Sequence, residues 1–138
     1  MRDQQRVTAY LCAKGAADAI DFYKRAFNAE ERYRINDQAT GRVGHAELVV
    51  HGATLYLSDE WPEMGVLAPN TLKGSSVSFV IDADDVDADF QRAIDAGATV
   101  ERPITEAPWG RGGWLIDPFG HRWNIQKGNP DFNPDDMK

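Results

Sequence analysis

His45 and Glu47 stand two residues apart in "GHAELVV" (44–50), and this pair is the first candidate for chemistry in the chain. In an extended strand, residues at i and i+2 lie on the same face. An imidazole and a carboxylate on one face can act as an acid–base pair or as two ligands of a metal ion. They can also form a polar hydrogen-bonded pair in a wet groove, so the spacing leaves three interpretations open.

A second group of candidates lies in "WGRGGWLIDPFGHRWNIQ" (109–126), which contains three tryptophans, two arginines and a histidine. Strand alternation over its last six residues places Arg122 and Asn124 on one face and His121 and Trp123 on the other. We expect the polar face to line a ligand cleft and Trp123 to lie in the core. His121 follows a turn glycine, which is typical of a turn or packing histidine.

Aromatic and hydroxyl side chains extend this candidate cleft. Trp114 is expected to face it, Trp61 and Trp109 lie in loops that predict a pocket rim, and Arg122 can anchor an anionic group. The candidate ligand contacts are Thr8, Tyr10, Tyr56, Trp61, Ser76, Ser78, Trp109, Trp114, Arg122 and Asn124.

The elements that must position these residues are revealed by an internal repeat. "YKRAFNA" (23–29) recurs as "FQRAIDA" (90–96), with an aromatic residue, Arg-Ala, an apolar residue and a final Ala in register. Each copy closes a pattern with helical spacing. Gly15 precedes the first helix, Gly97 is a good stop for the second, and Asp84 or Asp85 can cap the start of the second.

Strand patterns surround each helix and repeat in the same order. One strand precedes each helix, at Val7–Leu11 and Ser76–Ile81, and three follow it, so that each half reads βαβββ. The strands that follow are "EERYRI", "GHAELVV" and "ATLYLSD" in the first half, and "TVERPI", "GGWLID" and "HRWNIQ" in the second.

Neither half is large enough to bury a sheet face alone. The sequence therefore predicts an α+β fold in which two tandem modules form one curved mixed sheet, with helices outside and a concave ligand cleft. We expect a single domain over residues 1–127, with module one at about 6–60, module two at about 75–127 and a polar tail at 128–138.

Composition and charge narrow the class of partner. The chain has 138 residues, of which 42% are hydrophobic and 27% are charged, and a formal charge of -7. Such a chain is typical of a globular protein and has no membrane span, and its acidity argues against nucleic acid as a partner. Cys12 is the one cysteine, which predicts packing rather than a disulfide and favours a cytoplasmic setting.

The two modules, with "AIDFYKRAFNAE" and "DPFGHRWNIQ", resemble the vicinal oxygen chelate superfamily, which includes glyoxalase I, bleomycin resistance proteins, fosfomycin resistance enzymes and extradiol dioxygenases. "GHAEL" and "LYLSDEWPEMG" look most like its PhnB-like branch. The resemblance covers residues 6 to about 127 and implies a homodimer. It does not imply one reaction, because function depends on the site.

In metal-dependent members, the resemblance implies one ligand from the first and last strand of each module, usually His, Gln or Glu. The matching positions here are Thr8, Tyr56, Ser76 (or Ser78) and Asn124. These groups would leave the charge of a divalent cation unneutralised. No metal or other cofactor is therefore predicted, and a divalent metal at a shifted site is the disfavoured alternative.

Three functions remain open from the sequence. The first is a metal-independent protein of the bleomycin resistance type that sequesters a cationic or aromatic small molecule. The second is a glyoxalase-like lyase or isomerase that uses His45 and Glu47 as acid–base groups or as shifted metal ligands. The third is a domain of this fold with an unknown metabolite or a regulatory role. Whether the chain is an enzyme is left undecided.

Overall fold

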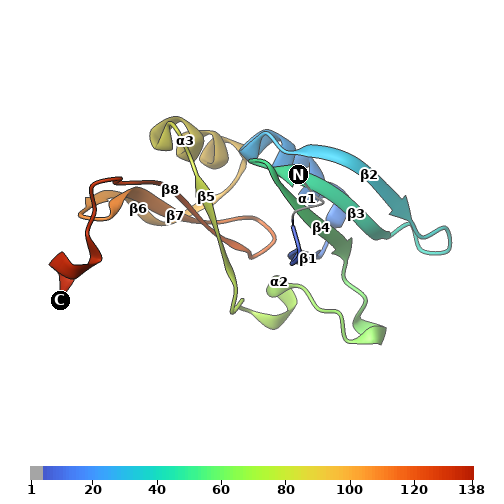
Figure 1. Ribbon diagram of the computed structural model, residues 1–138. Helices are drawn as coiled ribbons and strands as arrows, with labels where there is room; N and C mark the ends of the chain where they lie inside the picture. Colours follow the sequence, from blue (N-terminus) through green and yellow to red (C-terminus); the bar gives the residue numbers. More distant parts are fainter. Residues whose placement is uncertain (1–4) are drawn as a thin grey trace.

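The chain folds into two βαβββ modules, as Figure 1 shows for the computed structural model, which describes residues 5–138. The first module contains β1 (Tyr10–Ala13), α1 (Ala16–Phe27), β2 (Glu30–Asn36), β3 (Val43–Val50) and β4 (Ala53–Asp59). The second contains β5 (Ser78–Asp82), α3 (Val86–Ala96), β6 (Thr99–Ala107), β7 (Gly110–Ile116) and β8 (Arg122–Gly128). Short helices lie outside the modules, at Pro62–Met64, at α2 (Pro69–Leu72) and at Pro134–Met137. The predicted α+β fold with tandem modules is confirmed.

Each module builds a four-stranded sheet of its own. The strand orders are β1-β4-β3-β2 and β5-β8-β7-β6. In both sheets the first strand of the module lies parallel to the last, and the other pairs are antiparallel. The sheet was predicted as one curved surface, and the structure divides it in two. The polar faces of the modules are therefore separate surfaces.

The helices begin and end where the glycines and the capping residue predict. Gly15 precedes α1 with a φ of 98°, and Gly97 follows α3 with a φ of 125°. Positive φ is readily adopted by glycine because it has no Cβ. Of the two candidate caps for α3, Asp85 is the one used, since its side chain accepts a hydrogen bond from the Ala88 N–H.

An aromatic core lies between α1 and the strands. Tyr23 and Phe27 of α1 stack on each other, and the Phe27 ring centroid lies 4.6 Å from that of Trp123. Trp123 is 2% exposed, which confirms its predicted place in the core. Burial of such large rings is a main driving force for folding.

Two polar contacts join the modules through this core. The buried carboxylate of Asp117, between β7 and β8, accepts hydrogen bonds from the Tyr23 hydroxyl at 2.6 Å and from Trp123 Nε1 at 2.9 Å. His121 Nε2 lies 3.0 Å from the Cys12 carbonyl oxygen. His121 is buried and therefore packs between the modules, as expected for a packing histidine.

The first strand of each module begins later than predicted. β1 starts at Tyr10 rather than Val7. In the segment before β1, the side-chain amide of Gln5 makes the hydrogen bonds to the Thr54 backbone that a longer strand would make with its own backbone. β5 starts at Ser78 rather than Ser76. There the Ser75 hydroxyl bonds to the backbone of Val77 and competes with strand pairing.

None of the helices within residues 5–138 is long and apolar enough to span a bilayer.

Candidate functional site

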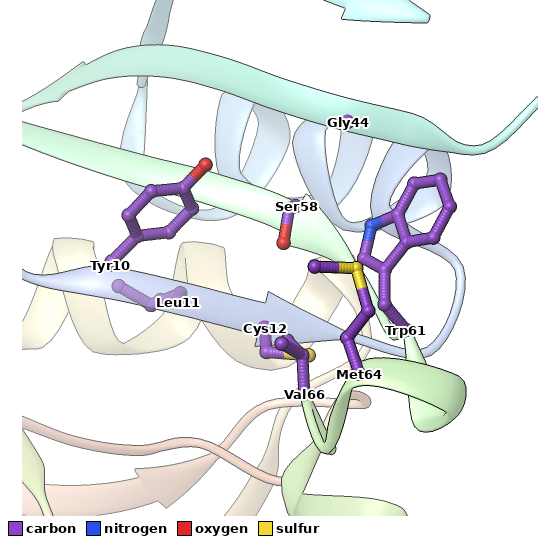
Figure 2. Close-up of a pocket in the computed structure, with 8 residues that line it drawn as sticks. All are labelled: Tyr10, Leu11, Cys12, Gly44, Ser58, Trp61, Met64 and Val66. Carbon is purple, nitrogen blue, oxygen red and sulfur yellow. The ribbon is translucent and has the colours of Figure 1, made fainter. Parts of the chain in front are cut away.

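A pocket opens on the face of the first sheet that points away from α1. Its volume is about 490 Å³, and it lies among β1, β3, β4 and the segment that follows β4 (Figure 2). We call it the Trp61 pocket; its lining residues are Tyr10, Leu11, Cys12, Gly44, Ser58, Trp61, Met64 and Val66. In Figure 2 the Tyr10 ring and the Trp61 ring stand at opposite sides, with Ser58 between them.

Strand register explains why Tyr10 and Ser58 line this face. Tyr10 pairs with Tyr56 and Cys12 pairs with Ser58 across the parallel strands β1 and β4. Leu11 and Leu57 alternate with them and lie in the core. The shift of β1 also changes the outcome for Thr8, which was expected on the first strand as a ligand contact. Thr8 lies before β1, and its hydroxyl accepts a hydrogen bond from Gln5.

Gly44 faces the pocket because β3 contains an irregularity. The pairing with β2 runs from Ile35↔His45 to Asn36↔Val43 and so skips Gly44. Strict alternation from His45 would place Val43 on the same face as His45. The extra residue breaks that alternation, so Val43 is turned into the core and is 1% exposed.

Two carboxylates at the end of β4 hold the segment that closes the pocket. Asp59 accepts hydrogen bonds from the Ala16 N–H at 2.8 Å and the Val43 N–H at 2.6 Å. It thereby ties the start of α1 to the start of β3. Glu60 accepts a hydrogen bond from the Thr71 hydroxyl at 2.5 Å. The chain that carries Trp61 is thus fixed at its base.

The Cys12 thiol at the pocket wall is poorly ionised. Burial raises its pKa from the ordinary 9.0 to about 11, and the negative charges of Glu60 and Asp59 add to the effect. A nucleophilic cysteine needs the opposite environment, with a lowered pKa. The thiol is therefore a packing group, in agreement with the sequence interpretation, and the potential beside it is negative.

An aromatic cluster borders the pocket around His45. The Tyr10 hydroxyl lies 2.6 Å from His45 Nδ1, and the Tyr56 ring centroid is 4.9 Å from the His45 ring. Partial burial raises the pKa of Tyr10, and the neighbouring Tyr33 and Tyr56 raise it further. The phenol therefore keeps its proton at neutral pH. It donates to His45 when the imidazole carries its own proton on Nε2.

Glu47 lies in the same part of the sheet but has its own charge partner. Its side chain is 2% exposed, and Arg32 Nη1 lies 3.3 Å from its Oε2. A buried carboxylate is costly without such compensation. His45 and Glu47 thus share one face of β3, as predicted, with Tyr10 as the partner of the first and Arg32 as the partner of the second.

The remaining predicted residues gather on the second sheet. The Arg122 guanidinium lies over the Trp114 ring, with Cζ 4.5 Å from its centroid, and donates to Glu101 at 2.6 Å and to the Ser78 hydroxyl at 2.7 Å. This ion pair lowers the pKa of Glu101. Arg122 is thus already neutralised, which weakens its predicted role as an anchor for an anionic group.

A smaller hollow of about 240 Å³ lies beside this group on the second sheet, and Trp109, Trp114 and Asn124 are among the residues that line it. Trp109 is half exposed and touches Phe132 of the tail, with ring centroids 6.4 Å apart. Ser76 lies in the loop before β5 and lines a third hollow, of about 360 Å³, together with Tyr10. The predicted single cleft is therefore divided: Tyr10 and Trp61 line the Trp61 pocket, Tyr10 and Ser76 line the third hollow, and Trp109, Trp114 and Asn124 line the hollow on the second sheet.

The donor chemistry does not fit a divalent metal at the positions implied by the resemblance. In the structure these positions hold Thr8 or Tyr10, Tyr56, Ser78 and Asn124, without imidazole or carboxylate. Among residues 5–138, no group of three or more His, Cys, Asp or Glu side chains is placed to hold a metal ion. His45 and Glu47 would need a third ligand of that kind.

The sequence did not indicate all of the pocket. Met64 and Val66 belong to a loop whose shape depends on mutual hydrogen bonds between Trp61 and Val66, at 2.8 and 3.0 Å. Arg42 reaches this loop from the β2–β3 hairpin. Contacts between distant loops leave no periodic pattern. The loop tryptophan was the available signal, and it did place Trp61 at a pocket rim.

Comparison with known proteins places these features in a family context. The family model of the Glyoxalase/Bleomycin resistance protein/Dioxygenase superfamily matches residues 5–125. The chain is 38% identical over 136 residues to uncharacterized protein Mb0911c of Mycobacterium bovis, covering 96% of this chain and 89% of that protein.

Solved structures show the same architecture. The X-ray structure of the At5g48480 gene product of Arabidopsis thaliana is 27% identical, with a TM-score of 0.71, and the match covers 89% of this chain and 98% of that one. The PhnB protein of Bacillus cereus, described as a putative 3-demethylubiquinone-9 3-methyltransferase, is 20% identical, with a TM-score of 0.66, and the match covers 90% and 100%. The second likeness concerns the fold alone.

Proposed function

Because this chain belongs to the glyoxalase/bleomycin resistance protein/dioxygenase superfamily, we propose that it binds a small aromatic cation in the Trp61 pocket without a metal ion. The pocket itself is the observation that carries this proposal. Its volume of about 490 Å³ falls within the range of roughly 300–1,000 Å³ that is usual for small-molecule sites.

The lining favours a flat, apolar body. Tyr10 and Trp61 stand at opposite sides of the pocket, so a planar ligand can contact aromatic rings at both ends (Figure 2). Met64 adds a flexible thioether that adapts to ligand shape. Ser58 lies between the two rings, and because its hydroxyl donates to the Asp59 carbonyl oxygen, its oxygen can only accept a hydrogen bond from the ligand.

The charge distribution favours a cation over an anion. The carboxylates of Glu60 and Asp59 lie near the Cys12 wall and help to raise the pKa of its thiol. The cation at the opposite wall, Arg42 over Trp61, is paired with Glu63. The net charge of -7 also steers cations toward the protein. A planar aromatic cation therefore matches both the lining and the field.

Fluorescence titration tests this proposal with matched probes and matched variants. Proflavine is the cationic probe, and 1-anilinonaphthalene-8-sulfonate is the anionic one. We expect proflavine to bind more tightly, and Trp61→Ala to weaken it about tenfold, as expected when a central aromatic contact is lost. Trp109→Ala removes an indole outside the pocket and should leave proflavine binding unchanged. Equal losses in both variants, or preference for the anion, would contradict the proposal.

A homodimer is part of this proposal. Open hollows lie on both sheets, and Tyr10, Val77 and Val80 expose more than half of their surface. A second copy could cover such apolar surface. Sedimentation equilibrium at micromolar concentration should give twice the chain mass, and a single-chain mass would remove this part of the proposal.

An acid–base enzyme is the second candidate function, and the Tyr10–His45 contact of 2.6 Å favours it. A lyase or isomerase reaction needs a group that takes up and returns a proton, and an imidazole is the side chain that most often does so. Glu47, beside Arg32, would support it. Glu47→Gln should then abolish turnover of a hemithioacetal or related dicarbonyl adduct at an unchanged melting temperature. If a turnover exists and survives this substitution, the assignment is wrong.

A further inference from the structure

The wall of the Trp61 pocket that follows β4 is a separate loop. Residues 61–66 close on themselves through the Trp61–Val66 backbone pair, and Gly65 completes the turn with a φ of 75°. Trp61, Met64 and Val66 from this loop all line the pocket. Met64 is 75% exposed, so the tip of the loop packs little against the rest of the molecule. We call residues 61–66 the wall loop.

Arg42 bridges the wall loop to the β2–β3 hairpin. Its Nη1 lies 3.1 and 3.0 Å from the two carboxylate oxygens of Glu63, and its Cζ lies 4.5 Å from the centroid of the Trp61 ring. One guanidinium thus makes an ion pair with the tip of the loop and a cation–π contact with the tryptophan that lines the pocket. It contacts the loop from a different part of the chain.

The base of Arg42 is itself well fixed. Asp37 accepts hydrogen bonds from the Thr40 N–H and hydroxyl, and the Asp37 N–H donates to the Arg42 carbonyl at 2.7 Å. The Arg42 N–H in turn donates to the Thr40 hydroxyl. The hairpin is therefore a firm support, and the wall loop is the partner able to move when the bridge breaks.

We propose that Arg42 is a positioning residue that holds the wall loop closed and so sets the rate at which molecules reach the interior of the Trp61 pocket. Both of its contacts are partly exposed, and each is individually weak. Their combined loss is nevertheless expected to raise the population of the open loop roughly fivefold. Loss of the Arg42 contacts should therefore change the rates at which molecules enter and leave the pocket, and not the stability of the fold.

The sole cysteine provides a readout that needs no ligand. Cys12 lines the Trp61 pocket and also the hollow that contains Ser76. The sequence contains no other thiol, so every adduct is at this position, and the change in rate caused by a wall-loop substitution reports on access through the Trp61 pocket. The test measures the modification rate of the intact protein by mass spectrometry with two uncharged reagents, the bulky N-(1-pyrenyl)maleimide and the small methyl methanethiosulfonate. Rates are compared over a pH series, which separates access from any change in thiol ionisation.

Arg42→Ala should raise the rate with the bulky reagent about fivefold and the rate with the small reagent much less. Arg42→Lys keeps the charge but loses the flat guanidinium that stacks on Trp61. Its modification rate should therefore lie between those of the wild type and Arg42→Ala. Glu63→Gln should act in the same direction as Arg42→Ala. At 1 M salt, screening should raise the rate in the wild type and leave Arg42→Ala unchanged.

Arg92→Ala is the matched control, since Arg92 makes a surface ion pair with Asp89 on α3. Its modification rate and that of the wild type should agree. An unchanged rate in Arg42→Ala, or an equal rise in Arg92→Ala, would overturn the proposal. The Cys12 test does not depend on the proposed function, because the thiol reaction requires no bound ligand. If proflavine also binds, its dissociation should accelerate in Arg42→Ala by the same factor.

Discussion

Four hydrogen bonds converge on the carboxylate of Asp117. Besides Tyr23 and Trp123, the backbone N–H groups of Phe119 and His121 donate to it, at 2.8 and 3.0 Å. Asp117→Ala would leave these buried donors unsatisfied and should reduce the free energy of unfolding by about 3 kcal/mol or more. Urea denaturation measures the loss.

Tyr23→Phe removes one of these four bonds and should cost about 1.5–3 kcal/mol, because the acceptor is charged. The exposed Asp95 bonds to Gln91 on the surface of α3, so Asp95→Ala should stay within about 0.5 kcal/mol of the wild type. If Asp117→Ala is as mild as Asp95→Ala, Asp117 does not hold the modules together.

Alkaline pH should weaken the fold mainly through Cys12 and Tyr23, and the raised pKa of Tyr10 adds to the later part of the decline. Burial and the neighbouring Asp117 raise the pKa of Tyr23 well above its ordinary 10.0, and the pKa of Cys12 rises from 9.0 to about 11. A group with a raised folded pKa stabilises the fold below its unfolded pKa, and that stability is lost as the pH rises through the folded value.

Stability should therefore begin to fall above about pH 9, where the unfolded thiol ionises, and fall more steeply above pH 10. Urea midpoints between pH 8 and 11 measure this loss. Cys12→Ala should remove the early part of the decline, and Tyr23→Phe the later part. A flat profile in the wild type would contradict the argument.

Single residues were predictable to the extent that strand alternation holds. Strand alternation correctly predicted that His45 and Glu47 share one face and that Trp123 lies in the core. It did not find Arg42, because a cation that bridges two loops has no periodic signature. Strict alternation also misplaced Val43, where an irregularity in β3 intervenes.

At the scale of elements, the contact between α3 and β7 depends on a glycine. A Cβ at Gly113 would lie 2.7 Å from Phe90 Cε1 and 3.0 Å from the Ile104 nitrogen. Gly113→Ala should therefore push helix and strand apart and cost about 1–3 kcal/mol. A Cβ at Gly74 would meet open space, so Gly74→Ala should be neutral or slightly stabilising. Equal melting temperatures for the two variants would show that this packing can relax.

The repeat predicted the elements well and their first strands less well. The start of α1 and the end of α3 followed from Gly15 and Gly97, because glycine at these positions indicates a backbone with positive φ. The starts of β1 and β5 depend on side chains that replace backbone pairing, those of Gln5 and Ser75. Such local competition is not visible in a pattern of apolar residues.

At the scale of the whole molecule, the sequence predicted two βαβββ modules but not how they meet. Alternation assigns a polar and an apolar face to each strand, and this holds whether the modules share one sheet or form two. The structure forms two sheets, linked through the Asp117 and His121 contacts. The candidate residues are consequently spread over separate surfaces, and the Trp61 pocket is larger and more apolar than the hollow on the second sheet.

Isothermal titration of proflavine into chelator-treated protein tests the central claim most directly. We expect one ligand per chain, with the same affinity after Mn²⁺ or Zn²⁺ is added. Gly44→Leu should abolish binding by filling the pocket without unfolding the protein, since a Cβ at Gly44 meets only the Ile35 carbonyl at 3.6 Å. Gly74→Leu, whose Cβ meets open space, is the control and should bind normally. Binding that appears only with metal, or that persists in Gly44→Leu, would contradict a metal-independent Trp61 pocket.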